Sequence, residues 1–304
     1  MQLFKTTLVI LCILFAGANA EAQDPDDILK QLEKEMSGDE KDKTEYATAT
    51  FKTTRLINGH TVENVGKGVL DVKISHRFGN LNDGGYELFG LDKATMRMGM
   101  DYGITPYLMV GFGRSTFEKT YDAFAKLKIL RQSSGKRKMP VTISYVPTIA
   151  LKTIKDAEPD KTNYYTSRLF FTHQLIIGRK FSEGTSLQIM PTFVHQNLVA
   201  LEKEPNDLFA IGIGGRQKLT KRISLNVEYY YQLPDYKLTG RTNSLSVGFD
   251  IETGGHVFQL HFTNSPGMNE RTFISDTKGE WGKGDILFGF NISRVFTIGK
   301  NKRG

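Results

Sequence analysis

Charged side chains stand at alternate positions in several extended segments of this sequence, on the face opposite the apolar residues. Successive side chains of a strand point to opposite faces, so this spacing gathers the charges on one side of each strand. A ring of such strands would bring both signs of charge around one interior, where they pair or line a polar passage. Twelve residues are our candidates for an interior lining: Arg97, Asp101, Asp122, Lys126, Lys152, Arg168, Arg216, Lys218, Glu228, Asp250, Glu252 and Asp285.

The candidates divide by sign along the chain. The middle segments supply the basic residues Lys152, Arg168, Arg216 and Lys218. The last segments supply the acidic residues Glu228, Asp250, Glu252 and Asp285, and the first segments mix both signs. One interpretation is that these charges pair across a narrow interior and plug it. The other is a transverse field across a wet pore, which would orient polar solutes; the sequence leaves both open.

The elements that must carry these residues are strands. From residue 66 onward the apolar residues recur with a period of two, and a helical period is almost absent. Most of the segments run about 9–14 residues, long enough for a tilted strand to cross a bilayer. We expect twelve strands near 67–77, 95–104, 107–115, 120–132, 139–152, 164–180, 185–197, 208–218, 222–233, 243–252, 255–264 and 284–298.

The connections between these strands alternate in length. Short ones fall at 105–106, 133–138, 181–184, 219–221 and 253–254, and long ones at 78–94, 153–163, 198–207, 234–242 and 265–283. An up-and-down barrel of the outer membrane has short periplasmic turns and longer outer loops. Residues 116–119 break the rule, so either a neighbouring strand is misplaced or this outer loop is tight. An even number of strands leaves both chain ends on the periplasmic side.

The polarity of the faces favours a membrane over water. A soluble sandwich also alternates, with its apolar face inward. Here, however, aromatic residues crowd the apolar face near the strand ends, as in the girdles of membrane barrels. The sequence therefore predicts an all-β fold, a transmembrane up-and-down antiparallel β-barrel of about 12 strands. His173 and Arg294 fit badly, because both fall on the apolar face.

The regions outside the strands divide the chain further. Residues 1–22 have the apolar core and small residues of a cleaved signal peptide. Residues 23–45 read as a short periplasmic helix and a charged linker. Residues 46–65 are polar and extended, with a turn at Asn58-Gly59, and we expect them to enter the lumen as a plug, with a periplasmic tail or an extra strand as the alternatives. The barrel follows at 66–298, and 299–304 is a basic tail.

Composition and motifs exclude several classes of function. The net charge of +7 would suit nucleic acid, but export to the outer membrane argues against that partner. Outer-membrane lipid and lipopolysaccharide suit it better, and basic residues in the expected periplasmic turns suggest a periplasmic protein partner. His256 and His261 lie on opposite faces of one strand and make a poor metal pair. We expect no cofactor, no metal and no catalytic residue.

Four segments carry a resemblance to a known family: 64–79 (NVGKGVLDVKISHRFG), 86–104, 248–268 and 284–298. They resemble a family of Bacteroidetes-type β-barrel proteins of unknown function, over roughly residues 46–298. The resemblance implies a membrane barrel and supplies no activity, cofactor or catalytic residue.

The functional expectation is therefore broad. We expect a passive or gated outer-membrane channel, or a membrane base for a periplasmic partner. The alternatives are a phospholipase- or protease-like outer-membrane hydrolase and a structural barrel without transport. The expected outer loops hold no histidine, which argues against the hydrolase.

Overall fold

The computed structural model describes residues 43–155, 164–199, 201–254 and 256–298. The expected signal peptide, residues 23–42 of the expected helix and linker, and the tail at 299–304 lie outside the described residues. The chain forms two compact units, and the described part of the first is residues 43–45 and 135–137. Strands β1 (Thr44–Tyr46) and β6 (Ser133–Gly135) form a small two-stranded sheet. The second unit is the barrel, which is described from here on.

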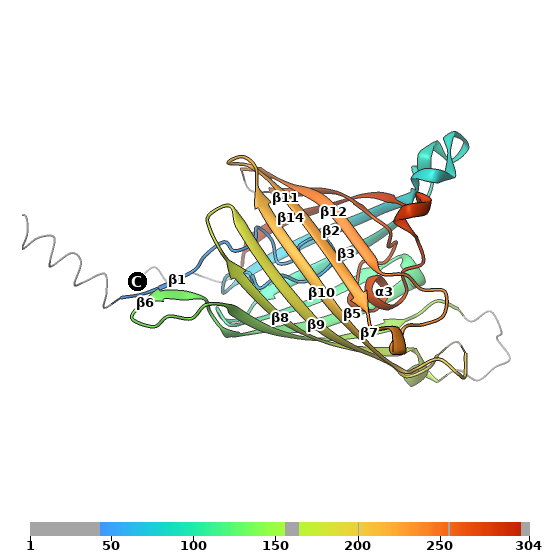
Figure 1. The fold of residues 1–304 in the computed structure, drawn as a ribbon, viewed down its shortest axis with the longest axis horizontal. Helices are drawn as coiled ribbons and strands as arrows, with labels where there is room; N and C mark the ends of the chain where they lie inside the picture. Colours follow the sequence, from blue (N-terminus) through green and yellow to red (C-terminus); the bar gives the residue numbers. More distant parts are fainter. Residues whose placement is uncertain (1–42, 156–163, 200, 255, 299–304) are drawn as a thin grey trace, which may run out of the picture. The chain divides into compact units, whose positions relative to one another are not determined.

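Twelve strands close into an antiparallel barrel (Figure 1). Each pairs with its neighbour in the sequence, and β14 closes the ring on β2, with Thr297 opposite Val69. The strands are β2 (Val69–Asn80), β3 (Ala94–Gly103), β4 (Leu108–Ser115), β5 (Thr120–Leu130), β7 (Thr142–Lys152), β8 (Leu169–Lys180), β9 (Thr185–Gln196), β10 (Asp207–Lys218), β11 (Ile223–Gln232), β12 (Ser244–Thr253), β13 (His256–Thr263) and β14 (Leu287–Thr297).

The expected fold is confirmed, and each expected strand overlaps one that the structure contains. The short connection at 116–119 is a tight outer loop, so neither neighbouring strand was misplaced. It contains the 3-10 turn η3 (Phe117–Lys119), in which Glu118 and Lys119 have φ angles of 52° and 49°. Two successive left-handed residues reverse the chain within this short space.

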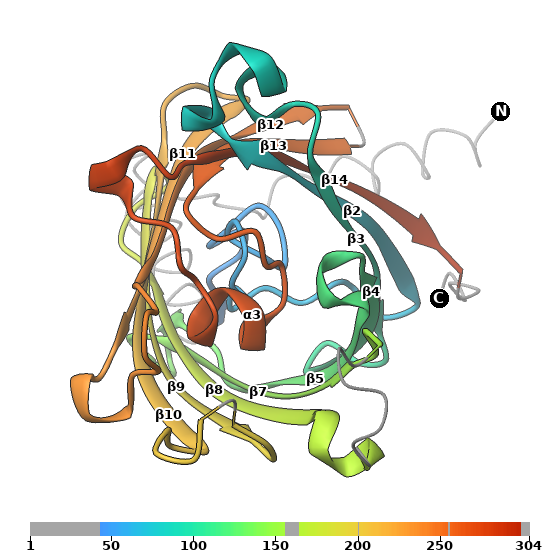
Figure 2. The ribbon, with the colours of Figure 1, turned by 90° about the vertical axis from the view of Figure 1, so that its right-hand side faces the viewer.

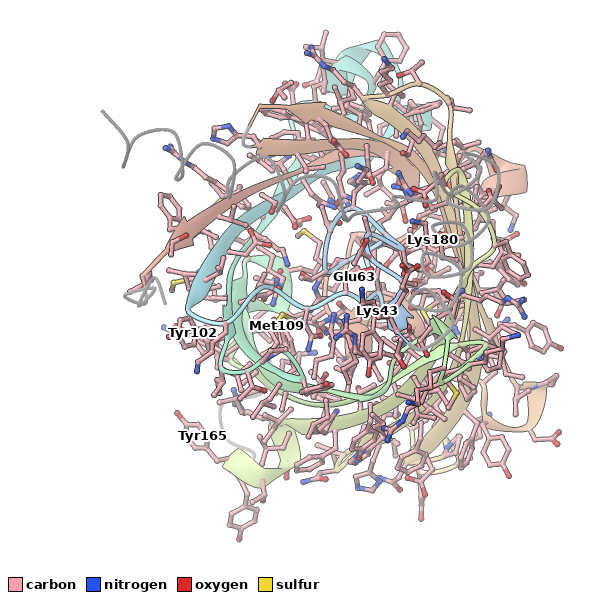
Figure 3. The ribbon with its side chains drawn as sticks, turned by 90° about the vertical axis from the view of Figure 1, so that its left-hand side faces the viewer. Lys43, Glu63, Tyr102, Met109, Tyr165 and Lys180 are labelled. Carbon is pink, nitrogen blue, oxygen red and sulfur yellow. The ribbon has the colours of Figure 1, made fainter. Side chains whose placement is uncertain are left out.

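The faces of the strands have the polarity of a membrane barrel. Met98, Met100 and Phe112 are about half exposed on the outer surface, whereas Arg97 and Asp101 are buried inside. Figure 3 shows the same division, with Tyr102 pointing outward and Met109 lying within the ring of strands. Apolar residues therefore meet the surroundings, and polar residues fill the interior.

The two residues that fitted the apolar face badly do lie on it. His173 is flanked by Tyr145 and Phe193, and the hydroxyl of Tyr145 lies 2.7 Å from its Nδ1. The guanidinium carbon of Arg294 lies 5.0 Å from the ring centroid of Phe296. Aromatic neighbours thus give each of these polar groups a partner on the outer surface.

The two ends of the barrel differ in their connections. We call the end with the start of β2 and the close of β14 the inner end, and the opposite end, with the long loops, the outer end. None of the helices in the described ranges is long and apolar enough to span a membrane. The outer loops carry η1 (Leu81–Asp83), η2 (Gly85–Gly90), η4 (Tyr165–Arg168), η5 (Pro234–Tyr236), α3 (Glu270–Ser275) and η6 (Trp281–Lys283).

Candidate functional site

Residues 46–65, which we call the inner segment, begin at the exposed Tyr46 and then run inside the ring of strands (Figures 2 and 3). The middle of the segment folds back on itself. The amide of Thr61 donates to the carbonyl of Thr54 at 3.0 Å, and the amide of Leu56 donates to the carbonyl of Gly59 at 2.8 Å. Ile57, Asn58 and Gly59 form the tip of this hairpin, and the side chain of Asn58 is only 1% exposed.

The carboxylate of Glu228, on β11, binds the tip through the backbone. It accepts hydrogen bonds from the amides of Ile57 at 3.2 Å, Asn58 at 2.8 Å and Gly59 at 3.1 Å. Three successive amides converging on one carboxylate form an anion-binding nest, here occupied by the barrel wall itself.

The tip also touches both strands at which the barrel closes. Arg77, on β2, donates from Nη2 to Oδ1 of Asn58 at 2.7 Å. Asn291, on β14, donates from Nδ2 to the carbonyl of Ile57 at 2.9 Å. Arg77 also donates from Nη1 to Oδ1 of Asn291 at 3.0 Å, so the two wall residues and the tip form one network.

Further charged residues hold the two arms of the hairpin. Lys126, on β5, donates from Nζ to the carbonyls of Thr54, Thr61 and Glu63 at 3.0, 2.9 and 2.9 Å. Lys73 on β2 bonds both to Asp101 on β3 and to the hydroxyl of Thr54. The wall thus binds the inner segment mainly through its polar and charged side chains.

One side of the hairpin is apolar. Leu56 and Val62 join a buried cluster with wall residues such as Ile176 and Met190. Gly214 on β10 makes room for this packing, because a Cβ there would lie 2.6 Å from Cδ2 of Leu56. The lumen therefore has a charged part and an apolar part, and the hairpin fits both.

Helix α3 enters the lumen from the outer end (Figure 2). Asn269 caps it, since its side chain accepts from the amide of Thr272 at 3.0 Å, and the Thr272 hydroxyl accepts from the amide of Asn269. All six residues of the helix are buried. Phe273 packs edge-to-face on Tyr230, with the ring centroids 5.1 Å apart.

The inner segment and α3 meet at Glu270. Its Oε1 lies 2.6 Å from Nη1 of Arg55 and 3.3 Å from Nε2 of His60. Burial, together with the nearby charges of Arg55 and Lys126, holds the pKa of His60 well below its usual value, so the ring is neutral. The charged pair at this junction is therefore Arg55 with Glu270.

The neighbouring residue on α3, Arg271, faces a different set of groups. It forms an ion pair with Glu118 of the tight outer loop, and its guanidinium carbon lies 4.2 Å from the ring centroid of Phe170. Lys152 pairs with the other oxygen of Glu118 at 2.5 Å. Burial raises the pKa of Glu118, but the two cations outweigh it and the pKa lies below its usual value.

Cavities lie at both ends of the lumen. One of about 620 Å³ at the outer end is lined by residues including Phe78, Lys93 and Asp285. Another of about 620 Å³ at the inner end is lined by residues including Phe51 and Glu252. The inner segment and α3 lie inside the ring of strands (Figure 2).

The structure places the twelve candidate residues in two groups. Seven have buried side chains on the interior face: Arg97, Asp101, Asp122, Lys126, Arg216, Glu228 and Asp250. The other five are half-buried near the barrel ends, with Lys152, Arg168 and Asp285 at the outer end and Lys218 and Glu252 at the inner end.

The mixed charges of the first strands pair with near neighbours. Arg97 donates from Nε to Oδ1 of Asp122 at 2.9 Å, between the nearby strands β3 and β5. Lys126 and Glu228 bind the inner segment instead of a charge across the lumen. Pairing is therefore local, and it includes the inner segment.

Reasoning from the sequence missed α3 and the groups around it. Glu270, Arg271 and Glu118 were assigned only to outer loops. One signal was available, because Phe273 and Ile274 form an apolar pair within a long polar loop and follow the helix-capping residue Asn269.

Residues 51–296 match a family described as "Membrane bound beta barrel domain (DUF5777)". The chain belongs to this family. No curated protein matches the sequence. As a member of the DUF5777 family with a closed barrel of twelve strands, the chain is a membrane-bound β-barrel.

Several solved barrels resemble this DUF5777 protein in fold. The NanC porin is 8% identical, with a TM-score of 0.46, over 75% of this chain and 98% of its own. An outer membrane channel from Pseudomonas putida F1 is 13% identical, with a TM-score of 0.43, over 77% and 98%. Omp33 of Acinetobacter baumannii is 8% identical, with a TM-score of 0.40, over 75% and 97%.

The side chains of the DUF5777 barrel bear on two kinds of chemistry, metal binding and hydrolysis. In the described part of the chain no three His, Cys, Asp or Glu residues are grouped so that they could hold a metal ion. Nδ1 of His195 lies 2.6 Å from Oδ1 of Asp207 near the outer end. The serine hydrolase triad places a hydroxyl on the other ring nitrogen, and the described residues make no hydrogen bond to that nitrogen of His195.

Proposed function

We propose that this protein is a gated outer-membrane channel whose lumen is closed at rest by the inner segment, acting as a plug, together with α3. The observation that supports it is the nest at the tip, where Glu228 accepts three backbone amides. The barrel wall binds the segment as it would a ligand. Cavities of about 620 Å³ lie at the outer and inner ends, on either side of the segment.

The kind of contact supports a reversible plug. Lys126, Lys73 and Glu228 hold the segment by hydrogen bonds to its backbone and to the Thr54 hydroxyl, which water can replace once the lumen is wet. The apolar contacts come from Phe51, Leu56, Val62 and Val65, which join the buried cluster of the wall. Withdrawal of the hairpin toward the inner end would also take Arg55 away from Glu270 and so release α3. The two cavities would then join without breaking a pair of wall strands.

Conductance in planar bilayers tests the proposal. The parent barrel should show rare, brief openings, whereas a variant without residues 46–65 should show a steady open level. Resistance of the deleted barrel to unfolding in SDS without heating establishes that it has folded. A folded deletion variant that conducts no more than the parent would overturn the proposal, and a structural barrel would then be the better description.

A peptide supplies the matched control. Synthetic peptide 46–65, added to the inner-end compartment, should block the deleted barrel. A peptide of the same composition in scrambled order should leave the open level unchanged. Equal effects of the two peptides would indicate unspecific obstruction instead of a plug.

The remaining features of this proposal concern location and partners. Residues 1–22 would direct export and be removed. The exposed apolar belt would contact outer-membrane lipid and lipopolysaccharide. Basic residues at the inner end, such as Lys221 and Arg222, would favour an acidic periplasmic protein as a partner. Co-purification of such a protein from cross-linked membranes, lost when both residues are changed to Gln, tests this.

A further inference from the structure

A cavity of about 380 Å³ opens between α3 and the outer ends of β7, β8 and β9. Its basic residues outnumber its acidic ones by five to three. The acidic residues are Glu118, Glu204 and Asp276, and the basic residues are Lys152, Arg168, Arg241, Arg271 and Lys278. A partly enclosed cavity with excess positive charge concentrates anions.

Arg271 is the central basic group of this cavity. Its side chain is only 9% exposed, and it pairs with Glu118 through Nη1. Its Nε is buried without a hydrogen-bond partner among the described residues. Buried donors are nearly always satisfied, so an unpaired N–H of a guanidinium marks a position where an acceptor is expected. Glu118 engages Nη1 and Nη2 lies 3.8 Å from Oδ2 of Asp276, so Nε is the donor left without a partner.

The remaining residues of the cavity wall indicate what kind of group a bound anion would carry besides its charge. Phe170, Leu198, Val199 and Leu238 give it an apolar side, and Gln196 and Ser275 add neutral polar groups. The volume is in the lower range of sites for small molecules. Inorganic ions would leave the apolar side empty, whereas a small organic acid would cover it.

We propose that this cavity binds a small organic carboxylate, held by Arg271 and the surrounding cations, with its carbon skeleton against Leu238 and Phe170. The proposal names a solute class for the gated channel and in that sense rests on the proposed function. The site itself is complete in the closed barrel, so binding does not require conduction.

A matched pair of probes tests the charge. Cyclohexanecarboxylate and cyclohexanecarboxamide have nearly the same shape, and only the first is an anion. Titration calorimetry on the full-length barrel in nanodiscs should show the carboxylate binding at least about tenfold more tightly, which corresponds to about 1.4 kcal/mol. Inorganic phosphate, which lacks the apolar part, should bind more weakly than the carboxylate. Equal binding of acid and amide, or tighter binding of phosphate, would overturn the proposal.

Variants locate the site. Arg271→Gln should weaken carboxylate binding at least about tenfold. Because Arg271 also pairs with Glu118, Lys278→Gln is the second variant; Lys278 has no carboxylate partner within the described ranges and should lose about threefold through the weaker field. Lys283→Gln, which removes an exposed outer-loop cation outside this cavity, is the control and should bind as the parent does. Parent-like affinity in both cavity variants would place any binding elsewhere.

The outcomes for site and channel are separable. Selective carboxylate binding by a barrel that never conducts would refute the channel and leave the site standing. The opposite result is also possible: the deletion variant conducts, but both it and the parent bind cyclohexanecarboxylate no more tightly than the amide. That result would refute the site and leave the channel standing.

Discussion

The strongest prediction concerns Glu228→Gln. The parent carboxylate accepts the amides of Ile57, Asn58 and Gly59 at 2.8–3.2 Å. A glutamine keeps one acceptor oxygen and replaces the other by an NH₂ donor, so part of this set is lost and the rest is no longer charge-assisted. Hydrogen bonds to a charged group contribute about 1.5–3 kcal/mol each. We expect the free energy of undocking the tip to fall by about 2–4 kcal/mol, allowing for non-additivity.

Amide hydrogen exchange measures this quantity directly. A loss of about 2–4 kcal/mol corresponds to roughly 30- to 800-fold faster exchange of the three tip amides, when exchange occurs through local opening. Asp285→Asn is the matched control, because Asp285 also accepts a backbone amide, that of Glu280 at 3.0 Å, but lies away from the tip. Tip exchange in Glu228→Gln that stays within about threefold of the control would refute the reasoning that the nest holds the segment.

Three further predictions follow from buried contacts. Phe273→Ala removes a fully buried ring and should cost about 3–5 kcal/mol in the docking of α3, seen as greater acrylamide quenching of Trp281, the single tryptophan, in the same loop. Asp122→Asn leaves the buried Arg97 guanidinium without its charged partner and should destabilise the barrel by about 3–5 kcal/mol, measured as a lower midpoint of heat unfolding in detergent. The docked segment holds His60 neutral with a lowered pKa, so below the ordinary value of about 6.5 the undocked segment binds more protons. Docking should therefore weaken as pH falls below about 6.5. After correction for intrinsic rates, tip exchange should be faster at pH 5.5 than at 7.5 in the parent and unchanged in His60→Gln.

Much of the fold follows from the sequence because a membrane wall imposes a strict local rule. Every residue of a spanning strand faces either lipid or lumen, so a period of two identifies strands such as 95–104 without knowledge of their partners. Sequential pairing then leaves little freedom in topology. Even the positions of His173 and Arg294 followed from the period.

The contents of the lumen obey no such rule. The sequence places Glu228 and Lys126 inside, but their partners are backbone groups of residues 54–63, which no pattern of side chains reveals. Arg55 and Glu270 are 215 positions apart and come from opposite ends of the barrel. Only the three-dimensional structure brings such groups together, so the site was predicted less completely than its wall.

The contact of the hairpin tip with both edges of the sheet bears on assembly. Ile57 and Asn58 are covalently tethered to β2, and they bind Asn291 of β14. Bringing together the first and last strands of a long sheet carries the largest chain-entropy cost of ring formation. A tethered group that recognises the last strand raises its effective concentration beside the first. The hairpin tip thus holds the first and last strands together. A barrel that lacks the tip should close more slowly, even where its final stability is unchanged.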